Sequence, residues 1–345
     1  MSDSERTSRR KIDHVRINLE EAVGSRLTTG LERLRFLPLA LPEIDLETIS
    51  LSGRFLGFGF DAPLLISSMT GGADDLAAIN IRLAEAAQAR GIVMGVGSQR
   101  AAIESGDLSG SFEIRRQAPD AILLANLGAV QLNYGYGVDE CRRAVDMIRA
   151  DALILHFNAL QEAVQPEGDT RWAGLLDRVA AVCRQLEVPV LAKEVGWGFS
   201  PDDARRLSEA GIAAFDVAGA GGTSWSEVEK HRAETEAQRR VAAAFVGWGI
   251  PTVESLRALR RTLPGVPLIA SGGLTDGMDV AKVLALGAGL AGLAGPFLRA
   301  AAVSTEAVIE EIDVLARILR IAMFGIGAAD LDGLSNSPRL IEVDR

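Results

Sequence analysis

The sequence predicts an α/β protein whose core is a (β/α)8 barrel, with an N-terminal extension before it and a C-terminal helix after it. Eight short apolar segments alternate with amphipathic segments, and each of the eight is nearly all apolar rather than alternating between apolar and polar residues. Strands of that kind are typical of a parallel sheet covered on both faces. Eight is also the number of parallel strands, joined by helices, that closes into a barrel.

The expected strands and helices follow in chain order. The strands span 62–69, 91–98, 121–128, 152–158, 188–196, 213–221, 266–273 and 288–295. Amphipathic helices are expected between them, for example over 76–91 and 252–263, and glycine often closes such a segment as it does at helix C-termini. With a further helix over 305–324, we assign residues 1–60 to the extension and 61–345 to the TIM barrel and its C-terminal helix.

The segment after the sixth strand, 221–252, is unusually long for a connection within a barrel. Its middle is charged and lacks the residues typical of turns. Loops of this length are usually functional or mobile.

Composition limits the classes of function. The chain has 345 residues, 48% of them hydrophobic, which is enough for a large core in a single unit. A formal net charge of −10 argues against wrapping nucleic acid or binding an anionic membrane. The two cysteines lack metal-ligand spacing, which favours a reducing, cytoplasmic compartment. We find no signal peptide, and no uncharged apolar run reaches the roughly 20 residues of a membrane span.

Small or polar residues stand at the carboxyl ends of all eight expected strands, where barrels of this type place their active sites. In chain order these ends carry Ser68, Met69 and Thr70, then Ser98 and Arg100, Asn126, His156 and Asn158, Lys193, Thr223, Gly272 and Gly273, and Ala294 and Gly295. Each alone has an ordinary explanation, such as a tight turn or a helix cap. Their occurrence at every strand end predicts an active site.

Two of these features are more specific. Gly272-Gly273 and Ala294-Gly295 follow the last two strands, where backbone N–H groups and a helix N-terminus can hold a phosphate that larger side chains would block. Lys193 lies within an apolar strand, and a buried lysine is costly without an anionic partner. We therefore expect a negative group, such as a reduced flavin, to face Lys193. Pairing with Glu194 is disfavoured because adjacent strand residues point to opposite faces.

The N-terminal segment holds a basic cluster, Arg10, Lys11 and His14. If the segment is helical, the three side chains share a face, since residues three and four apart are neighbours. Three donors on one face suit a diphosphate. From the segment alone, an ordinary solvated basic tail is the alternative.

Together these motifs resemble the type 2, FMN-dependent isopentenyl-diphosphate Δ-isomerases. The most specific runs are His156-x-Asn158-x-x-Gln161-Glu162 and AGAGGTSW at 218–225. The other strand-end motifs and the Arg10-Lys11-x-x-His14 motif occur in the family's order, so the resemblance covers nearly the whole chain. The charged middle of 221–252 is not carried over.

The resemblance implies an isomerase of isoprenoid biosynthesis that interconverts isopentenyl and dimethylallyl diphosphate, with FMN, NADPH as reductant and Mg2+. It implies that His156 and Asn158 line the substrate pocket, that Gln161 faces the reacting carbons, and that Glu162 binds magnesium. The reduced flavin would itself carry the protons, and His156 and Gln161 would be the catalytic side chains. The implied diphosphate contacts are Arg10, Lys11, His14, Ser98 and Arg100. The implied FMN contacts are Ser68, Met69, Thr70, Ser98, Asn126, Lys193, Thr223, Gly272, Gly273, Ala294 and Gly295. A homotetramer or homo-octamer is also implied.

Two other readings stay open. The first is an FMN-dependent oxidoreductase of the 2-hydroxy-acid oxidase type, which would place a histidine base and an arginine pair on the last loops. No histidine follows His231 in this sequence, which argues against an oxidase of this type. The second is a non-catalytic scaffold that binds flavin or phosphate. Fold alone cannot choose among them, because this barrel serves many chemistries.

Overall fold

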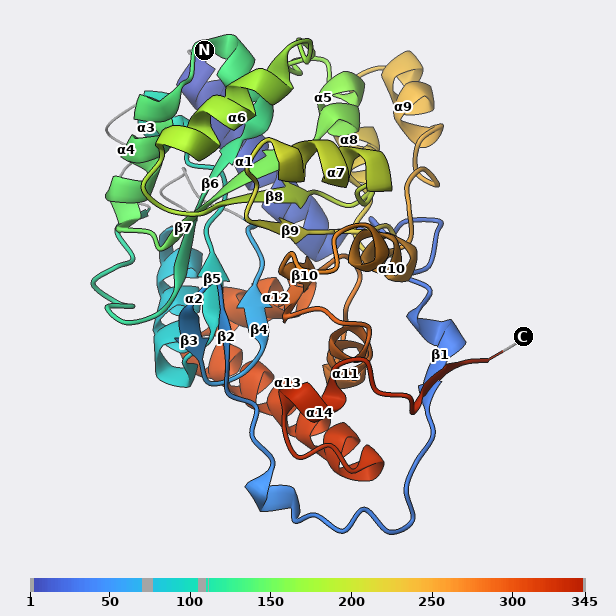
Figure 1. The fold of residues 1–345 in the computed structure, drawn as a ribbon. Coiled ribbons are helices and arrows are strands. Elements are labelled where there is room, and N and C mark those ends of the chain that lie inside the picture. The colour runs from blue at the N-terminus through green and yellow to red at the C-terminus, as the bar shows by residue number, and fades with distance from the viewer. Residues whose placement is uncertain (1–2, 70–76, 105–109, 111, 344–345) are drawn as a thin grey trace.

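A computed structural model describes residues 3–69, 77–104, 110 and 112–343 of the chain. Eight parallel strands form a closed barrel in the order β10-β11-β4-β5-β6-β7-β8-β9 (Figure 1). They are β4 (Leu64–Ile66), β5 (Val93–Gly95), β6 (Leu123–Gly128), β7 (Ala152–Phe157), β8 (Val190–Glu194), β9 (Ala214–Asp216), β10 (Leu268–Ala270) and β11 (Leu290–Leu293). Each lies within one of the eight predicted segments, so the predicted fold class is confirmed.

Helices follow the strands and cover the outside of the barrel. The predicted helices over 76–91, 252–263 and 305–324 are α2 (Ala77–Arg90), α10 (Thr252–Thr262) and α13 (Thr305–Ile326). Further helices are α3 (Arg100–Glu104), α4 (Val138–Ile148), α5 (Ala159–Val164), α6 (Leu175–Gln185), α7 (Pro201–Glu209), α11 (Gly277–Ala285), α12 (Gly295–Val303) and α14 (Leu331–Leu334). Short 3-10 helices cover Leu31–Arg33, Leu46–Thr48 and Ala129–Tyr134.

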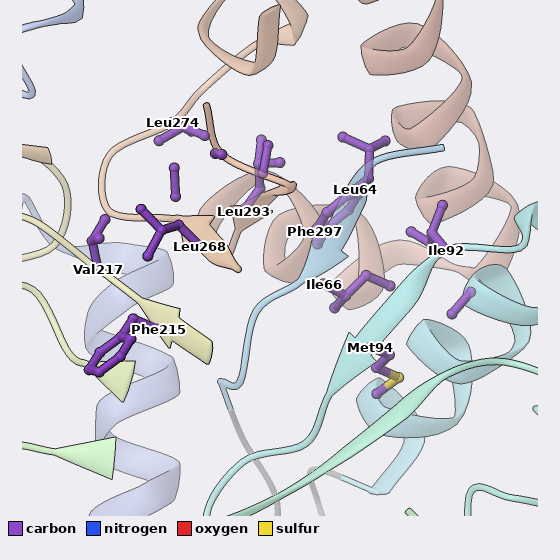
Figure 2. Close-up of a cluster of buried hydrophobic side chains, with 14 of the residues drawn as sticks. Leu64, Ile66, Ile92, Met94, Phe215, Val217, Leu268, Leu274, Leu293 and Phe297 are labelled. Carbon is purple, nitrogen blue, oxygen red and sulfur yellow. The ribbon is translucent and has the colours of Figure 1, made fainter. Parts of the chain in front are cut away.

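The strands separate two apolar layers because their side chains alternate in direction. Leu64 and Ile66 pack against the surrounding helices, together with side chains such as Phe215 and Phe297 (Figure 2). Leu65, between them, belongs to a second cluster inside the barrel. That inner cluster also holds Val93, Leu124, Ile154, Leu191 and Ile269, and Phe55 and Phe60 of the hairpin formed by β2 (Gly53–Phe55) and β3 (Phe58–Phe60). The hairpin thus packs against the interior of the barrel.

The N-terminal extension contributes both a helix at the barrel and a strand that meets the C-terminal segment. Helix α1 (Asp3–Glu20) contacts α3, α8 and α12 and runs, in dark blue, across the part of the molecule where those helices lie (Figure 1). Strand β1 (Leu34–Phe36) pairs antiparallel with β12 (Leu340–Glu342). Within the described part of the chain, no helix is both long and apolar enough to cross a membrane.

The long segment 221–252 is folded, which the sequence did not lead us to expect. It forms α8 (Trp225–Arg232) and α9 (Glu236–Ala243). Helix α9 begins with a capping box in which Thr235 accepts from the N–H of Gln238. Helix α8 contacts α1 and α5. The charged middle of the segment therefore lacks turn residues because it is helical.

Prediction on the fold. Gly272 has a φ of 99°, and a Cβ there would overlap the backbone of Gly219. Gly272→Ala should therefore destabilise the protein by about 1–3 kcal/mol through backbone strain. Gly265→Ala is the matched control, because a Cβ at Gly265 meets no atom within 4 Å. Thermal unfolding should show a lower midpoint for Gly272→Ala only, and equal midpoints would contradict the strain argument.

Candidate functional site

The barrel interior changes from apolar to polar at the carboxyl ends of its strands. His156 and Lys193 lie two residues beyond Ile154 and Leu191 on the same strands, so they share the inward direction of those side chains. The same step on other strands leads to further small or polar residues. This polar layer consists of Ser67, Asn126, His156, Lys193, Asp216 and Ser271.

Two adjoining cavities lie at this layer. We call the first the polar cavity; among its lining residues are Arg10, Lys11, His14, Ser98, Arg100, Asn126, His156, Asn158, Gln161 and Glu162. The second, the glycine cavity, is lined among others by Thr223, Gly272, Gly273, Ala294 and Gly295. Ser68, Met69 and Lys193 line both. The structure thus brings together every predicted site residue except Thr70, which lies outside the described residues.

The glycine cavity has the features of a phosphate-binding corner. Gly272 and Gly273 have φ of 99° and 76°, and a Cβ on either would overlap neighbouring backbone. Ala294 is the N-cap of α12, so the N-terminus of this nine-residue helix borders the cavity. The first N–H groups of a helix lack intrahelical partners and attract anions. The hydroxyl of Ser68 is buried with no hydrogen-bond partner among the described residues, which leaves a polar group available to a ligand.

Lys193 has a buried carboxylate beside it within the protein. Its Nζ lies 3.0 Å from Oδ2 of Asp216, which is 1% exposed, and donates to the carbonyl oxygen of Glu194 at 3.1 Å. The hydroxyl of Ser271 donates to the other oxygen of Asp216 at 2.6 Å. A negative group does face Lys193, as expected, but Asp216 supplies it. The burial of Lys193 therefore does not by itself require a flavin, which corrects that step of the sequence argument.

Glu194 faces away from the lysine side chain, as the alternation of strand residues predicts. Its Oε2 accepts from the backbone N–H groups of residues 195, 196, 197 and 198 at 2.6–3.1 Å. Burial nevertheless raises the pKa of Glu194 to about 7. The carboxylate organises the loop after β8, from which Val195 lines both cavities.

His156 is held as a neutral ring. Its Nδ1 lies 2.8 Å from Oδ1 of Asn126. Burial first, and then the positive charges of Lys193, Lys11 and Arg10, lower its pKa to about 4. A neutral ring donates from one nitrogen and accepts at the other, so Nδ1–H donates to Asn126 and Nε2 is an acceptor. At neutral pH His156 can orient a group but is not an imidazolium acid.

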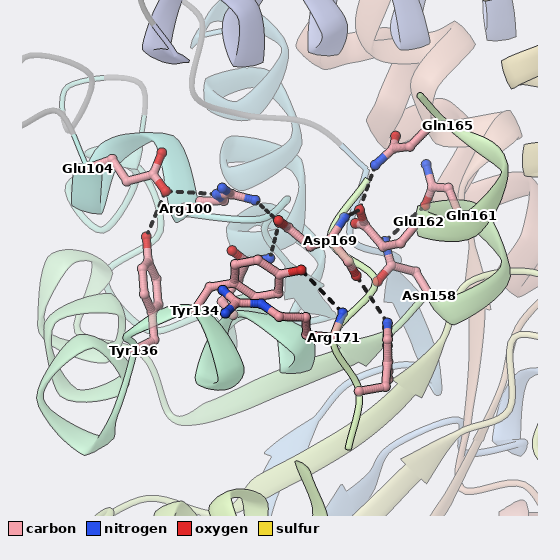
Figure 3. Close-up of polar contacts among 12 residues, drawn as sticks. Arg100, Glu104, Tyr134, Tyr136, Asn158, Gln161, Glu162, Gln165, Asp169 and Arg171 are labelled. Carbon is pink, nitrogen blue, oxygen red and sulfur yellow. Dashed lines mark hydrogen bonds and ion pairs between the residues drawn. The ribbon is translucent and has the colours of Figure 1, made fainter. Parts of the chain in front are cut away.

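Glu162 lines the polar cavity, where its carboxylate accepts three hydrogen bonds (Figure 3). Asn158 donates to its Oε1 at 2.8 Å, while Gln165 Nε2 and the backbone N–H of Asp169 donate to its Oε2 at 2.6 and 2.7 Å. All three donors are neutral. Among the described residues that line the two cavities, Glu162 is the only carboxylate.

Among the described residues, the protein offers magnesium only part of a ligand set. The described residues contain no group of three or more His, Cys, Asp or Glu placed to hold a metal ion. Mg2+ is commonly bound by one or two carboxylates with water and substrate phosphates completing the set. Glu162 is 7% exposed and, among the described residues, accepts hydrogen bonds only from neutral groups, so it fits that arrangement. The buried Oδ1 of Asn158, which has no hydrogen-bond partner within the described part of the chain, fits it as well.

Helix α1 places its basic residues against the barrel, so the alternative of a solvated tail is wrong. Lys11 Nζ donates to the carbonyl oxygen of Ser98 at 2.8 Å, and burial, with Arg10 next in effect, lowers its pKa to about 7. His14 Nε2 lies 3.0 Å from Glu229 of α8, and burial lowers its pKa. Arg100 is held by two carboxylates, Glu104 at 2.8 Å and Asp169 at 2.5 Å.

The same helix and the segment after it also border the glycine cavity. The hydroxyl of Thr223 donates to Asn18 of α1 at 3.0 Å, and Gly24 forms a β-bridge with Thr223. Ser25 donates from its N–H to the carbonyl oxygen of Gly222 at 2.8 Å. One N-terminal segment thus contacts the walls of both cavities.

Sequence reasoning missed several residues of this site, namely Gln131, Gln165, Asp169, Asp216, Trp225 and Glu229. Asp216 carries the same signal as Lys193, a charged residue inside an apolar strand. Trp225 stood within a quoted motif but received no role; its ring packs edge-on against His14 with centroids 5.0 Å apart.

Comparisons with known proteins agree with this geometry. A family profile described as FMN-dependent dehydrogenase matches residues 146–341. The chain is 54% identical to an isopentenyl-diphosphate delta-isomerase of Nostoc sp. over 98% of this chain and 97% of the relative. It is 53% identical to one of Xanthobacter autotrophicus over 97% and 98%. Among solved structures, a mandelate oxidase variant with a monooxide FMN adduct has a TM-score of 0.67 at 20% identity over 99% of both chains. A putative lactate oxidase of Pediococcus acidilactici has a TM-score of 0.68 at 19% identity, over 99% of this chain and 94% of its own.

Prediction on the buried ion pair. Asp216→Asn should destabilise the protein by about 3–5 kcal/mol, because Lys193 would be left buried without its carboxylate. Replacing both residues, Lys193→Met with Asp216→Leu, should recover most of that loss, because no buried charge remains. Denaturant unfolding of the wild type, Lys193→Met, Asp216→Leu and the double variant measures the coupling. Additive losses would show that the two charges do not interact.

Proposed function

The chain belongs to the isopentenyl-diphosphate delta-isomerase family, and on that premise we propose that it interconverts isopentenyl and dimethylallyl diphosphate with FMN and Mg2+ bound in the two cavities. The observation that carries the proposal is their juxtaposition. A glycine-lined corner suited to a cofactor phosphate adjoins a cavity that combines several basic side chains with a single described carboxylate, Glu162.

FMN fits the glycine cavity. Its phosphate would bind at Gly272, Gly273, Ala294 and Gly295, where backbone N–H groups and the start of α12 are available. Its ring would lie toward the part shared by the two cavities. The residues proposed to border the ring and the ribityl chain are Ser68, Met69, Ser98, Asn126, Lys193 and Thr223, with Thr70 outside the described residues. NADPH is proposed as the reductant.

The substrate's diphosphate fits the polar cavity. Arg10, Lys11, His14 and Arg100 line it, and the amide of Asn158 is fixed by its bond to Glu162. We propose that Glu162 binds Mg2+, which the diphosphate oxygens would also coordinate. A diphosphate and one magnesium ion leave net negative charge, which these basic side chains would balance.

The reaction adds a proton at one carbon and removes one from another, with no net transfer of electrons. The side chains proposed to face the hydrocarbon portion are poorly suited to carry those protons, because His156 has a pKa of about 4 and the amide of Gln161 is not an acid or base in this range. Glu162 is assigned to the metal and Lys11 to the diphosphate. When bound, reduced FMN supplies the proton donor and acceptor. The chain's part is to place the hydrocarbon portion against Gln161 and His156, hold the diphosphate and exclude water.

The oxidase alternative is weaker on one specific ground. The oxidases resemble the chain at 19–20% identity, which reflects a shared fold, whereas the relatives above 50% identity are named isomerases. A shared fold does not fix chemistry.

Prediction on Glu162. Purified protein should show a flavin absorbance spectrum that NADPH bleaches without oxygen, and the reduced protein should convert isopentenyl diphosphate in the presence of Mg2+. Glu162→Gln should keep the flavin and its bleaching but lose most of the activity, because a neutral amide binds magnesium poorly. Spectroscopy and a product assay on the same samples separate the two effects.

Normal activity of Glu162→Gln at limiting Mg2+ would contradict the metal assignment. A wild type that binds flavin without turning over the substrate would favour a non-catalytic scaffold. Oxidation of a 2-hydroxy acid without isomerisation would favour the oxidase.

Prediction on Lys11. With a pKa of about 7, this side chain is only about half charged at neutral pH in the free protein. A bound diphosphate stabilises the charged form and raises the pKa, so binding should take up protons near pH 7 and weaken as pH rises above that value. Calorimetry of inorganic pyrophosphate binding in two buffers of different ionisation enthalpy measures the uptake.

Lys11→Arg is the matched control, because arginine stays charged over this range. Protons taken up by pyrophosphate itself and by His14 contribute to both proteins. Subtracting the proton uptake of Lys11→Arg from that of the wild type therefore leaves the contribution of Lys11. Equal uptake by both would show that Lys11 is not the group that titrates.

A further inference from the structure

Asp169 lies in the loop between α5 and α6 and joins two groups that the proposed function assigns to different partners (Figure 3). Its carboxylate accepts from Nη1 of Arg100 at 2.5 Å and from Nε2 of Gln131 at 3.1 Å. Its backbone N–H donates to Oε2 of Glu162 at 2.7 Å. The side chain of Asp169 thus bonds Arg100, which is assigned to the diphosphate. The backbone of Asp169 bonds Glu162, which is assigned to Mg2+.

The loop has little freedom to hold Glu162 in another way. Its chain passes so close to α5 that a Cβ on Gly168 would overlap the carbonyl group of Glu162. Gln165 donates to the same oxygen of Glu162 as Asp169 does, and the indole N–H of Trp172 donates to the carbonyl oxygen of Asp169 at 3.1 Å. The segment from Gln165 to Asp169 therefore wraps the Glu162 carboxylate, and the Asp169 side chain anchors its far end.

Arg100 has a second carboxylate partner that lacks this link. Glu104, one helical turn later on α3, accepts from Nε of Arg100 at 2.8 Å. The same oxygen of Glu104 also accepts from the hydroxyl of Tyr136 at 3.4 Å. Glu104 therefore influences Arg100 by charge and geometry, whereas Asp169 influences both Arg100 and Glu162.

We propose that Asp169 is a positioning residue that couples the diphosphate-binding Arg100 to the magnesium-binding Glu162, so that the two subsites form as one unit. The inference rests on the proposed function. An anchored arginine loses less side-chain entropy when a ligand binds, and a loop anchored at Asp169 keeps the Glu162 carboxylate oriented for the metal. Loss of the Asp169 carboxylate should therefore reduce the gain in diphosphate affinity that Mg2+ provides.

The test compares Asp169→Asn with Glu104→Gln in FMN-loaded protein, using inorganic pyrophosphate as the probe with and without Mg2+. Both substitutions remove one negative charge next to Arg100. An effect of charge alone would therefore shift the affinity for pyrophosphate without Mg2+ in the same direction in the two variants. The measured quantity is the ratio of the pyrophosphate Kd without Mg2+ to that with saturating Mg2+. We expect this ratio to fall about tenfold in Asp169→Asn, the scale of one charge-assisted hydrogen bond, and to stay near the wild-type value in Glu104→Gln.

Equal ratios in the two variants, whether lowered or unchanged, would overturn the proposal. Asp169→Glu, which keeps the charge, should restore part of the ratio. If Asp169→Asn does not fold, Gln131→Leu weakens the hold on the same carboxylate and should lower the ratio more than Glu104→Gln does. A wild type that binds pyrophosphate with no help from Mg2+ would instead contradict the proposed function, so the two failures are distinguishable.

Discussion

Closure of eight parallel strands into a barrel is the constraint on which the site depends. Because the strands are parallel, all their carboxyl ends meet at one rim, and because side chains alternate, every second residue points inward. The inner positions first form an apolar cluster that includes Ile154 and Leu191, and two residues later they form the polar layer that includes His156 and Lys193. The apolar cluster supports the polar layer from below, so groups far apart in the sequence share one surface.

Burial and positive charge act together at this surface. The pKa of Lys11, His14 and His156 is lowered in each case, with burial as the first cause. Asp216 compensates Lys193 beneath the cavities, and four backbone N–H groups surround the carboxylate of Glu194. Glu162 has no comparable cationic compensation in its hydrogen bonds. Protonation of Lys11, His14 and His156 is therefore less favourable in the free protein than in water. A bound anion would favour their protonated forms, and a divalent cation would balance the carboxylate of Glu162.

The sequence carried enough information for the strands and for the polar residues at their ends, because those signals are local. Asp216 was also within reach, since counting inward positions from Ala214 places it beside Lys193. Asp169 and Glu229 were not, because they come from a loop and from α8, and their partners Arg100 and His14 are chosen by packing between distant segments. Local spacing could put Arg10, Lys11 and His14 on one face of a helix, but it could not say what that face would meet.

The contacts of α1 have a consequence for the order of events in a catalytic cycle. The helix bonds Ser98 at the polar cavity through Lys11, and it bonds Thr223 at the glycine cavity through Asn18. A rigid-body movement of α1 away from the barrel would break both of these contacts. With the proposed flavin and substrate bound in these cavities, flavin residence time and substrate entry rate would both depend on this one helix.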